Sequence, residues 1–337
     1  MPENTTERPC TAAPSTAERA EASTAQEGAA VPAKPTAAHG GADGWKPLLT
    51  STDWNEEWKR LQRTRRAADD PAYWDGRAHT FPADTEVSPY AQRFLDLAAI
   101  RPGETVFDMG CGTGALSLPL GLAGHKVVAA DFSAGMLSRM QEVLDARGVR
   151  TVFPKQMSWD EDWAAHGVRT GMTDIALASR SIATADLRDS LLRLTDIARR
   201  RVCVTLTTGS SPRTDERILA AIGLEDALCR DYLYALNILA AEGLRPTLDY
   251  IESARYDTFA SPADALEVLG RMVDGAAGAV AGDEARAAAM GRLRAWLDDN
   301  LVPNEHAGEP DRHGTPQGPL RLREPRVITW AFIAWDK

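Results

Sequence analysis

Short apolar runs alternate with amphipathic helical patterns through the middle of the chain. Five of these runs have the length of a buried strand, and in most of the segments between them apolar residues recur every three or four positions, as on one face of a helix. Such an alternation predicts an α/β fold with a doubly wound, mostly parallel sheet and right-handed crossovers. The expected strands are Val106–Met109, Lys126–Ala130, Thr151–Phe153, Asp174–Ala178 and Arg201–Leu206.

Capping signals place three helices beside these strands. A helix over Pro89–Ile100 follows Ser88, whose hydroxyl suits an N-cap, and a second helix begins after Ser133 and ends at Gly148. The third helix is marked by its apolar face, Leu187, Leu191 and Leu194.

The pattern changes after residue 211. Two helices are expected within 212–243, followed by one long strand over Thr247–Phe259. Residues 262–301 read as helical, residues 302–323 as a polar loop rich in proline and glycine, and Val327–Trp335 as the last strand. The chain is therefore expected to end in two strands joined by a long connection.

The N-terminal part differs in composition. Residues 1–43 contain one valine and no aromatic residue, leucine or isoleucine, so they are predicted to be a disordered tail. We assign residues 44–88 to a lid or cap, 89–211 to the core domain, and 212–337 to a helical substrate subdomain plus the closing strands.

Two aromatic groups lie within the predicted cap. Trp54, Trp58 and Leu61 fall on one face of a short helix, and we interpret the two tryptophans as packing residues. Tyr73 and Trp74 lie closer to the first strand, where an aromatic segment can close over a bound ligand.

A glycine-rich turn follows the first strand, in the run Asp108-Met109-Gly110-Cys111-Gly112-Thr113-Gly114. Glycines allow the backbone to approach a ligand closely. Asp131 ends the second strand, at the position where a carboxylate can accept the hydroxyls of a ribose. The glycine spacing also fits the dinucleotide fingerprint, but Asp108 would repel a pyrophosphate and would attract a cationic ligand.

The run from Asp108 to Gly114 resembles the first motif of the class I S-adenosylmethionine-dependent methyltransferases, and Asp131-Phe132-Ser133 resembles their second. The resemblance implies the class I fold: a doubly wound, mostly parallel sheet with an antiparallel C-terminal hairpin, here with an N-terminal helical lid and helical insertions. It also implies S-adenosyl-L-methionine as cofactor.

The cofactor contacts expected from this resemblance come from several segments. Phe132 and Met136 would flank the adenine, although Met136 also fits the core face of its helix. Ser158 and Trp159 stand where relatives carry an acidic residue followed by a small one, so Asp160 or the backbone alone could make that contact. The full expected set is Tyr73, Trp74, Asp108, Gly110, Gly112, Gly114, Asp131, Phe132, Met136, Ser158, Trp159 and Ser179.

No catalytic pair stands out, which agrees with an in-line displacement that depends mainly on positioning. Arg180 can orient an acidic acceptor through its guanidinium, and a surface salt bridge is the alternative. His79, Tyr234 and His306 are weaker candidates for a base. Cys203 lies between two valines and reads as a buried structural thiol.

The composition of the chain limits the classes of partner that we expect it to bind. The chain has 337 residues, of which 44% are hydrophobic, and a net charge of −10, which argues against a nucleic-acid acceptor. Four scattered cysteines show no metal-ligand spacing and suggest a reduced, cytoplasmic protein. No segment is apolar enough for membrane insertion. The sequence is compatible with a homodimer.

We therefore predict a methyltransferase that acts on a small-molecule acceptor. The alternatives are a catalytically silent binding or regulatory subunit with this fold and, less favoured, a Rossmann NAD-dependent oxidoreductase.

Overall fold

The computed structural model describes residues 46–64, 71–78, 87–225, 230–275, 282–311 and 314–337. The predicted tail and His79 lie outside these ranges. Residues from Pro47 onward form one unit, and the description below concerns this unit.

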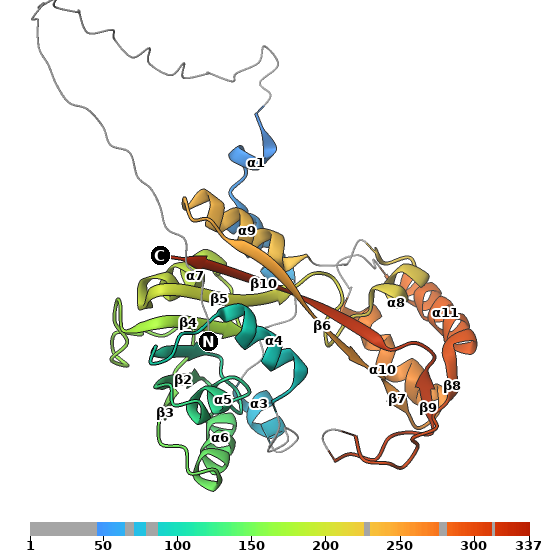
Figure 1. Cartoon of the computed structure of the whole chain (residues 1–337). Coiled ribbons are helices and arrows are strands. Elements are labelled where there is room, and N and C mark those ends of the chain that lie inside the picture. Colours follow the sequence, from blue (N-terminus) through green and yellow to red (C-terminus); the bar gives the residue numbers. More distant parts are fainter. Residues whose placement is uncertain (1–45, 65–70, 79–86, 226–229, 276–281, 312–313) are drawn as a thin grey trace, which may run out of the picture. The chain divides into compact units, whose positions relative to one another are not determined.

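A seven-stranded sheet forms the centre of the unit, with the order β3-β2-β1-β4-β5-β10-β6 (Figure 1). The neighbours from β3 to β5 pair in parallel, and β10 is antiparallel to both β5 and β6. This order confirms the expected class I methyltransferase fold with antiparallel strands at its C-terminal edge. The strands are β1 (Val106–Met109), β2 (Val127–Asp131), β3 (Val152–Gln156), β4 (Thr173–Ser179), β5 (Ala198–Thr207), β6 (Thr247–Arg255) and β10 (Arg326–Asp336).

Helices cover both faces of this sheet because its strands are apolar on both sides. One core joins the sheet to α4 (Pro89–Ala98), α5 (Ser117–Leu122) and α6 (Ala134–Ala146). The opposite core joins it to α2 (Trp54–Thr64), α7 (Leu187–Ile197) and α9 (Asp231–Ala241). The short helices α1 (Leu48–Ser51) and α3 (Pro71–Arg77) complete the N-terminal part.

The expected N-caps are present. The Ser88 hydroxyl accepts a hydrogen bond from the backbone N–H of Ala91 at 3.2 Å, and the Ser133 hydroxyl accepts one from Met136 at 3.1 Å. Trp58 is completely buried and donates its indole N–H to the carbonyl of Thr184 at 2.8 Å, so the packing interpretation of this tryptophan is confirmed.

A second, smaller core lies beyond the main sheet. It joins α8 to α10 and α11 around a three-stranded sheet of order β7-β9-β8 (Figure 1). We call this group the insertion unit. Its elements are α8 (Glu216–Ala221), β7 (Thr258–Phe259), α10 (Pro262–Gly275), α11 (Asp283–Asn300), β8 (Leu301–Pro303) and β9 (Leu320–Leu322).

The insertion unit corrects two expectations. The single strand predicted over residues 247–259 is broken, because β6 ends at Arg255 and β7 pairs in the smaller sheet. At the break, buried Asp257 accepts two hydrogen bonds from Arg326, at 2.8 Å from Nε and 2.5 Å from Nη2. The predicted polar loop over 302–323 also contains β9 and most of β8, each too short to show a periodic pattern.

Strand direction places the insertion unit near the candidate site. The carboxyl ends of parallel strands meet at one edge of a sheet, and β6 runs in the same direction as these strands. Since β10 is antiparallel, its first residue lies at that edge too. The connection from β6 to β7 and the connection from β9 to β10 therefore leave the main sheet at the carboxyl edge, as does the one from β5 to α8. No helix among the described residues is long and apolar enough to cross a membrane.

Candidate functional site

The turn after β1 contains three glycines with positive φ, at 73° for Gly110, 55° for Gly112 and 92° for Gly114. A side chain at Gly110 would collide with Ser181, and one at Gly114 would lie 2.9 Å from Met140. At Gly112, an added Cβ would meet no heavy atom within 4 Å. Two of these glycines therefore permit internal packing, whereas Gly112 faces open space.

Asp108 lies at the end of β1 and is only 2% exposed. Burial raises the pKa of this carboxyl from 3.8 to about 6. A hydrogen bond from the Ser117 hydroxyl to Oδ2, at 2.6 Å, opposes the shift, and the nearby charge of Asp131 adds to it. A cation placed next to Asp108 would favour the ionised form.

Asp131 connects the turns that follow β1 and β2. Its Oδ2 accepts the backbone N–H of Gly112 at 2.8 Å, and its Oδ1 accepts that of Ser133 at 2.9 Å. The carbonyl of the same residue accepts the N–H of Met157 at 3.0 Å, which attaches the loop after β3. Burial raises the pKa of Asp131.

The loop after β3 contains a buried donor. The indole N–H of Trp159 is buried and has no hydrogen-bond partner among the described residues. By contrast, Ser158 is held within its loop, since its N–H donates to Glu161 at 3.0 Å and its carbonyl accepts the Trp163 indole at 2.9 Å. On the other side of Asp131, Phe132 is half-buried and Met136 is buried on α6.

Helix α3 is anchored where the second motif ends. Asp75 Oδ1 accepts hydrogen bonds from the Ser133 hydroxyl at 2.6 Å and from the N–H of Gly135 at 2.9 Å, which together lower the pKa of Asp75. Tyr73, which is 41% exposed, packs edge-on against Trp74 with ring centroids 5.3 Å apart. The predicted lid aromatics thus belong to a helix attached next to Asp131.

A polar cluster lies at the ends of β4 and β5. The buried Tyr90 hydroxyl is 2.9 Å from the hydroxyls of both Ser179 and Thr205. The Arg180 guanidinium carbon lies 4.3 Å from the centroid of the Tyr90 ring. A buried tyrosine hydroxyl needs polar partners, and Ser179 and Thr205 supply them to Tyr90.

The remaining candidates lie apart from these groups. Tyr234 on α9 packs edge-on against Trp54 and Trp58, and His306 contacts Glu309 in an exposed loop. Cys203 is fully buried and burial raises its pKa to about 12, as expected for a structural thiol. In the ranges that the structure describes, no cluster of three His, Cys, Asp or Glu side chains is placed to hold a metal.

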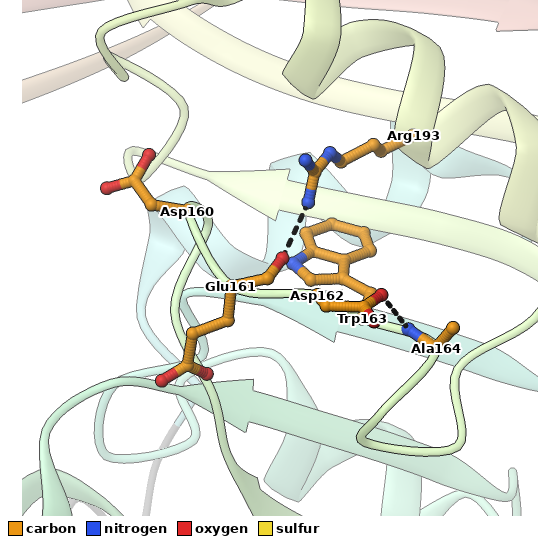
Figure 2. A pocket seen from close by; sticks show the side chains of 6 residues that line it. All are labelled: Asp160, Glu161, Asp162, Trp163, Ala164 and Arg193. Atoms are coloured by element: carbon orange, nitrogen blue, oxygen red, sulfur yellow. Dashed lines mark hydrogen bonds between the residues drawn. The ribbon is translucent and has the colours of Figure 1, made fainter.

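Two open cavities lie away from the glycine turn. Figure 2 shows the first, a hollow of about 450 Å³ at the loop after β3, where Arg193 of α7 donates to the carbonyl of Glu161 at 2.8 Å. The second, of about 480 Å³, lies between α3 and α6. The residues lining the first are Asp160, Glu161, Asp162, Trp163, Ala164 and Arg193, and those lining the second are Asp75, Ala78, Gly135, Ser138, Arg139 and Glu142.

Comparison with known proteins identifies the segment that contains both motifs. Residues 106–199 match a family described as a methyltransferase domain. An uncharacterized protein of Haemophilus influenzae is 29% identical over 268 residues, which cover 79% of this chain and 89% of that protein. A 23S rRNA (uracil(1939)-C(5))-methyltransferase of Nitrosococcus oceani is 44% identical over 48 residues, 14% of this chain and 11% of that enzyme.

Among solved structures, the YcgJ protein from Bacillus subtilis has a TM-score of 0.46 and 14% identity, covering 74% of this chain and 97% of its own. Residues 106–199 thus match a methyltransferase domain, and the strand order is that of the class I methyltransferase fold.

The buried position of Asp108 generates a prediction about stability. The folded protein retains a proton on this carboxyl between pH 3.8 and about 6, where the unfolded chain has lost it. Its favourable contribution is therefore complete below the lower value and is lost as the pH rises through the upper one. Asp108→Asn keeps the shape and an acceptor for Ser117 without the buried charge. We expect it to raise the free energy of unfolding by about 3 kcal/mol at pH 7 and by about half of that at pH 5.

Urea denaturation at the two pH values measures this difference. Asp160→Asn is the control, since Asp160 is exposed and its replacement should change stability little at either pH. A stabilisation by Asp108→Asn that is equal at pH 5 and pH 7 would contradict the raised pKa.

Proposed function

We propose that the protein is a methyltransferase that uses S-adenosyl-L-methionine and transfers its methyl group to a small-molecule acceptor. The observation that carries the proposal is the open face of Gly112 beside the carboxylate of Asp131. A backbone without a side chain and an acceptor for ribose hydroxyls lie together there, as this cofactor requires.

The other residues of the site fit the same cofactor. Asp108 favours a cationic ligand in its vicinity, and both the sulfonium and the amino group of S-adenosylmethionine are positive. The unpartnered Trp159 indole is a donor that an adenine ring nitrogen would satisfy. We assign the ribose to Asp131, the adenine to the segment containing Phe132, Met136, Ser158 and Trp159, and the methionyl part to the turn from Gly110 to Gly112 and to Ser179.

The chain's own part in the reaction is then mainly positioning. When bound, the sulfonium supplies an activated methyl group: its bond to sulfur breaks as the bond to the acceptor's nucleophilic atom forms, and neutral S-adenosylhomocysteine remains. Any proton released by the acceptor passes to solvent. Residues around the carboxyl edge hold the two reactants in line and exclude water, which is enough for a large rate enhancement.

Two features weigh against the other ligands considered. Asp108 would repel the pyrophosphate of a dinucleotide if it were seated on this turn. A nucleic-acid acceptor calls for a basic surface, whereas the chain has a net charge of −10. The match to an rRNA methyltransferase spans only 48 residues and therefore supports no conclusion about the acceptor.

The activity is tested with S-adenosylmethionine labelled in its methyl group. The purified chain is incubated with the labelled cofactor and a small-metabolite extract, and the expected result is labelled product together with S-adenosylhomocysteine. Calorimetric binding of S-adenosylhomocysteine without turnover of any extract would indicate a silent binding subunit. Binding of NAD without binding of S-adenosylhomocysteine would contradict the proposal.

Gly112→Ala tests the proposed cofactor space. Alanine at a positive φ costs roughly 1–2 kcal/mol of stability wherever it is introduced. Gly103, with φ 83° and likewise nothing within 4 Å of an added Cβ, precedes β1 and provides the matched control. We expect both variants to lose similar stability but only Gly112→Ala to lose affinity for S-adenosylhomocysteine, by at least tenfold in calorimetry. Equal affinities in the two variants would place the cofactor elsewhere.

The lid assignment predicts different behaviour for two helices of the N-terminal part. Amide hydrogen exchange in α3 should slow when S-adenosylhomocysteine binds, whereas α2, held by buried Trp58, should exchange at the same rate with and without it. Trp74→Ala should weaken cofactor binding with little change in stability, whereas Trp58→Ala should cost about 3–5 kcal/mol of stability. Unchanged exchange in α3 would show that it is a static part of the core.

A further inference from the structure

Arg180 extends the candidate site toward the β10 side of the sheet. It directly follows β4, and its guanidinium carbon lies 4.3 Å from the Tyr90 ring centroid and 5.9 Å from that of Trp330. Contacts with aromatic rings use the faces of a guanidinium and leave its N–H groups at the rim available. The arrangement therefore presents a flat set of donors at the carboxyl edge.

Neighbouring side chains fix the position of the Arg180 guanidinium, and we call this surrounding group its seat. The Tyr90 hydroxyl, hydrogen-bonded to both Ser179 and Thr205, sets the orientation of the ring below Arg180. The Thr205 hydroxyl also accepts the backbone N–H of Arg180 at 3.0 Å. The backbone of Arg180 is in the left-handed region, with φ 58°, where glycine is the default residue. An arginine in this conformation is strained, and such strain is concentrated at functional positions.

No acidic partner neutralises Arg180 within the part of the chain that the structure describes. Arginines nearby in sequence do have one: Arg188 pairs with Glu242, and Arg199 pairs with Asp174. Arg180 is exposed, and its guanidinium has only the two aromatic contacts there. This excludes, for the described residues, the surface salt bridge that was the alternative reading of Arg180.

The position of Arg180 relates it to the reacting partners. The next residue, Ser181, donates its hydroxyl to the carbonyl of Met109 at 2.7 Å and packs against Gly110, so this segment borders the glycine turn. The guanidinium itself lies near Trp330 on β10. That strand is three strands from β1 in the sheet, a spacing of roughly 14 Å.

We propose that Arg180 binds an anionic group, a carboxylate or a phosphate, of the methyl acceptor, and so selects acidic small molecules. The inference rests on the proposed function. The carboxylate of the cofactor has the same chemistry, and the proposed function assigns the methionyl part to Ser179, directly before Arg180. The guanidinium, however, lies by Tyr90 and Trp330 on the β10 side, so the acceptor is the ligand we expect there, and the experiment tests the cofactor as the other source.

The experiment separates a metabolite extract by anion exchange at neutral pH and assays each fraction with methyl-labelled S-adenosylmethionine. The acceptor should be in the retained, anionic fraction. With that fraction, Arg180→Gln should raise the apparent KM at least tenfold with little change in kcat, and should leave the affinity for S-adenosylhomocysteine within twofold of wild type. Arg169→Gln is the control, because it removes an exposed arginine that precedes β4, at the other edge of the sheet.

A second variant, Arg180→Gly, distinguishes loss of acceptor binding from loss of folding, because glycine adopts the left-handed backbone conformation without strain. It should keep the wild-type melting temperature or raise it, and lose acceptor binding as Arg180→Gln does. An acceptor found in the unretained fraction, or wild-type KM in both variants, would overturn the inference. A loss of S-adenosylhomocysteine affinity in them would also overturn it, by assigning the arginine to the cofactor. If the wild-type protein forms labelled product with none of the fractions, that result would instead contradict the proposed function.

Discussion

The carboxylate of Asp131 determines the geometry of the carboxyl edge. Its two oxygens accept the N–H groups of Gly112 and Ser133, and so they fix the turns after β1 and β2 relative to each other. The backbone carbonyl of the same residue holds Met157. Three loops, each at the end of a different strand, therefore depend on one residue. Because this residue is buried, the hydrogen bonds offset only part of the desolvation of its charge, and its pKa is raised.

The antiparallel strand β10 decides how the rest of the chain reaches that edge. Because it lies between β5 and β6, the connection from β6 and the connection to β10 both leave the sheet on the side where the glycine turn lies. The buried pair of Asp257 and Arg326 holds the two connections together. A buried ion pair of this kind adds more to specificity than to stability, because desolvation offsets most of its attraction. Here it fixes where the main sheet ends and the smaller one begins.

Arg180 and Asp108 are two residues of the candidate site whose conformation or burial is unfavourable for the stability of the fold. The first is an arginine in a backbone conformation that glycine would adopt without strain, and the second is a carboxylate buried at a cost to stability. We expect both to make the folded state less stable than Arg180→Gly or Asp108→Asn would. Residues that break local rules in this way, at one edge of one sheet, are typical of a functional site.

Local patterns in the sequence were sufficient to predict the parallel part of the main sheet, the caps at Ser88 and Ser133, and the grouping of Asp108, the glycine turn and Asp131, whereas the antiparallel edge was implied by the family resemblance. These features depend on periodicity, on the conformational freedom of glycine, and on the rule that ligands bind at the carboxyl ends of parallel strands. Each of these features follows either from residues that are close in sequence or from a fixed rule of topology.

Tertiary structure alone decided the features that depend on distant partners. The strand break at Asp257 requires Arg326, 69 residues later, and β8 and β9 are too short to show a period. The seat of Arg180 joins a ring from α4, a hydroxyl from β5 and a ring from β10. Such pairings are formed by the folded chain in space, and for that reason no window of the sequence contains them.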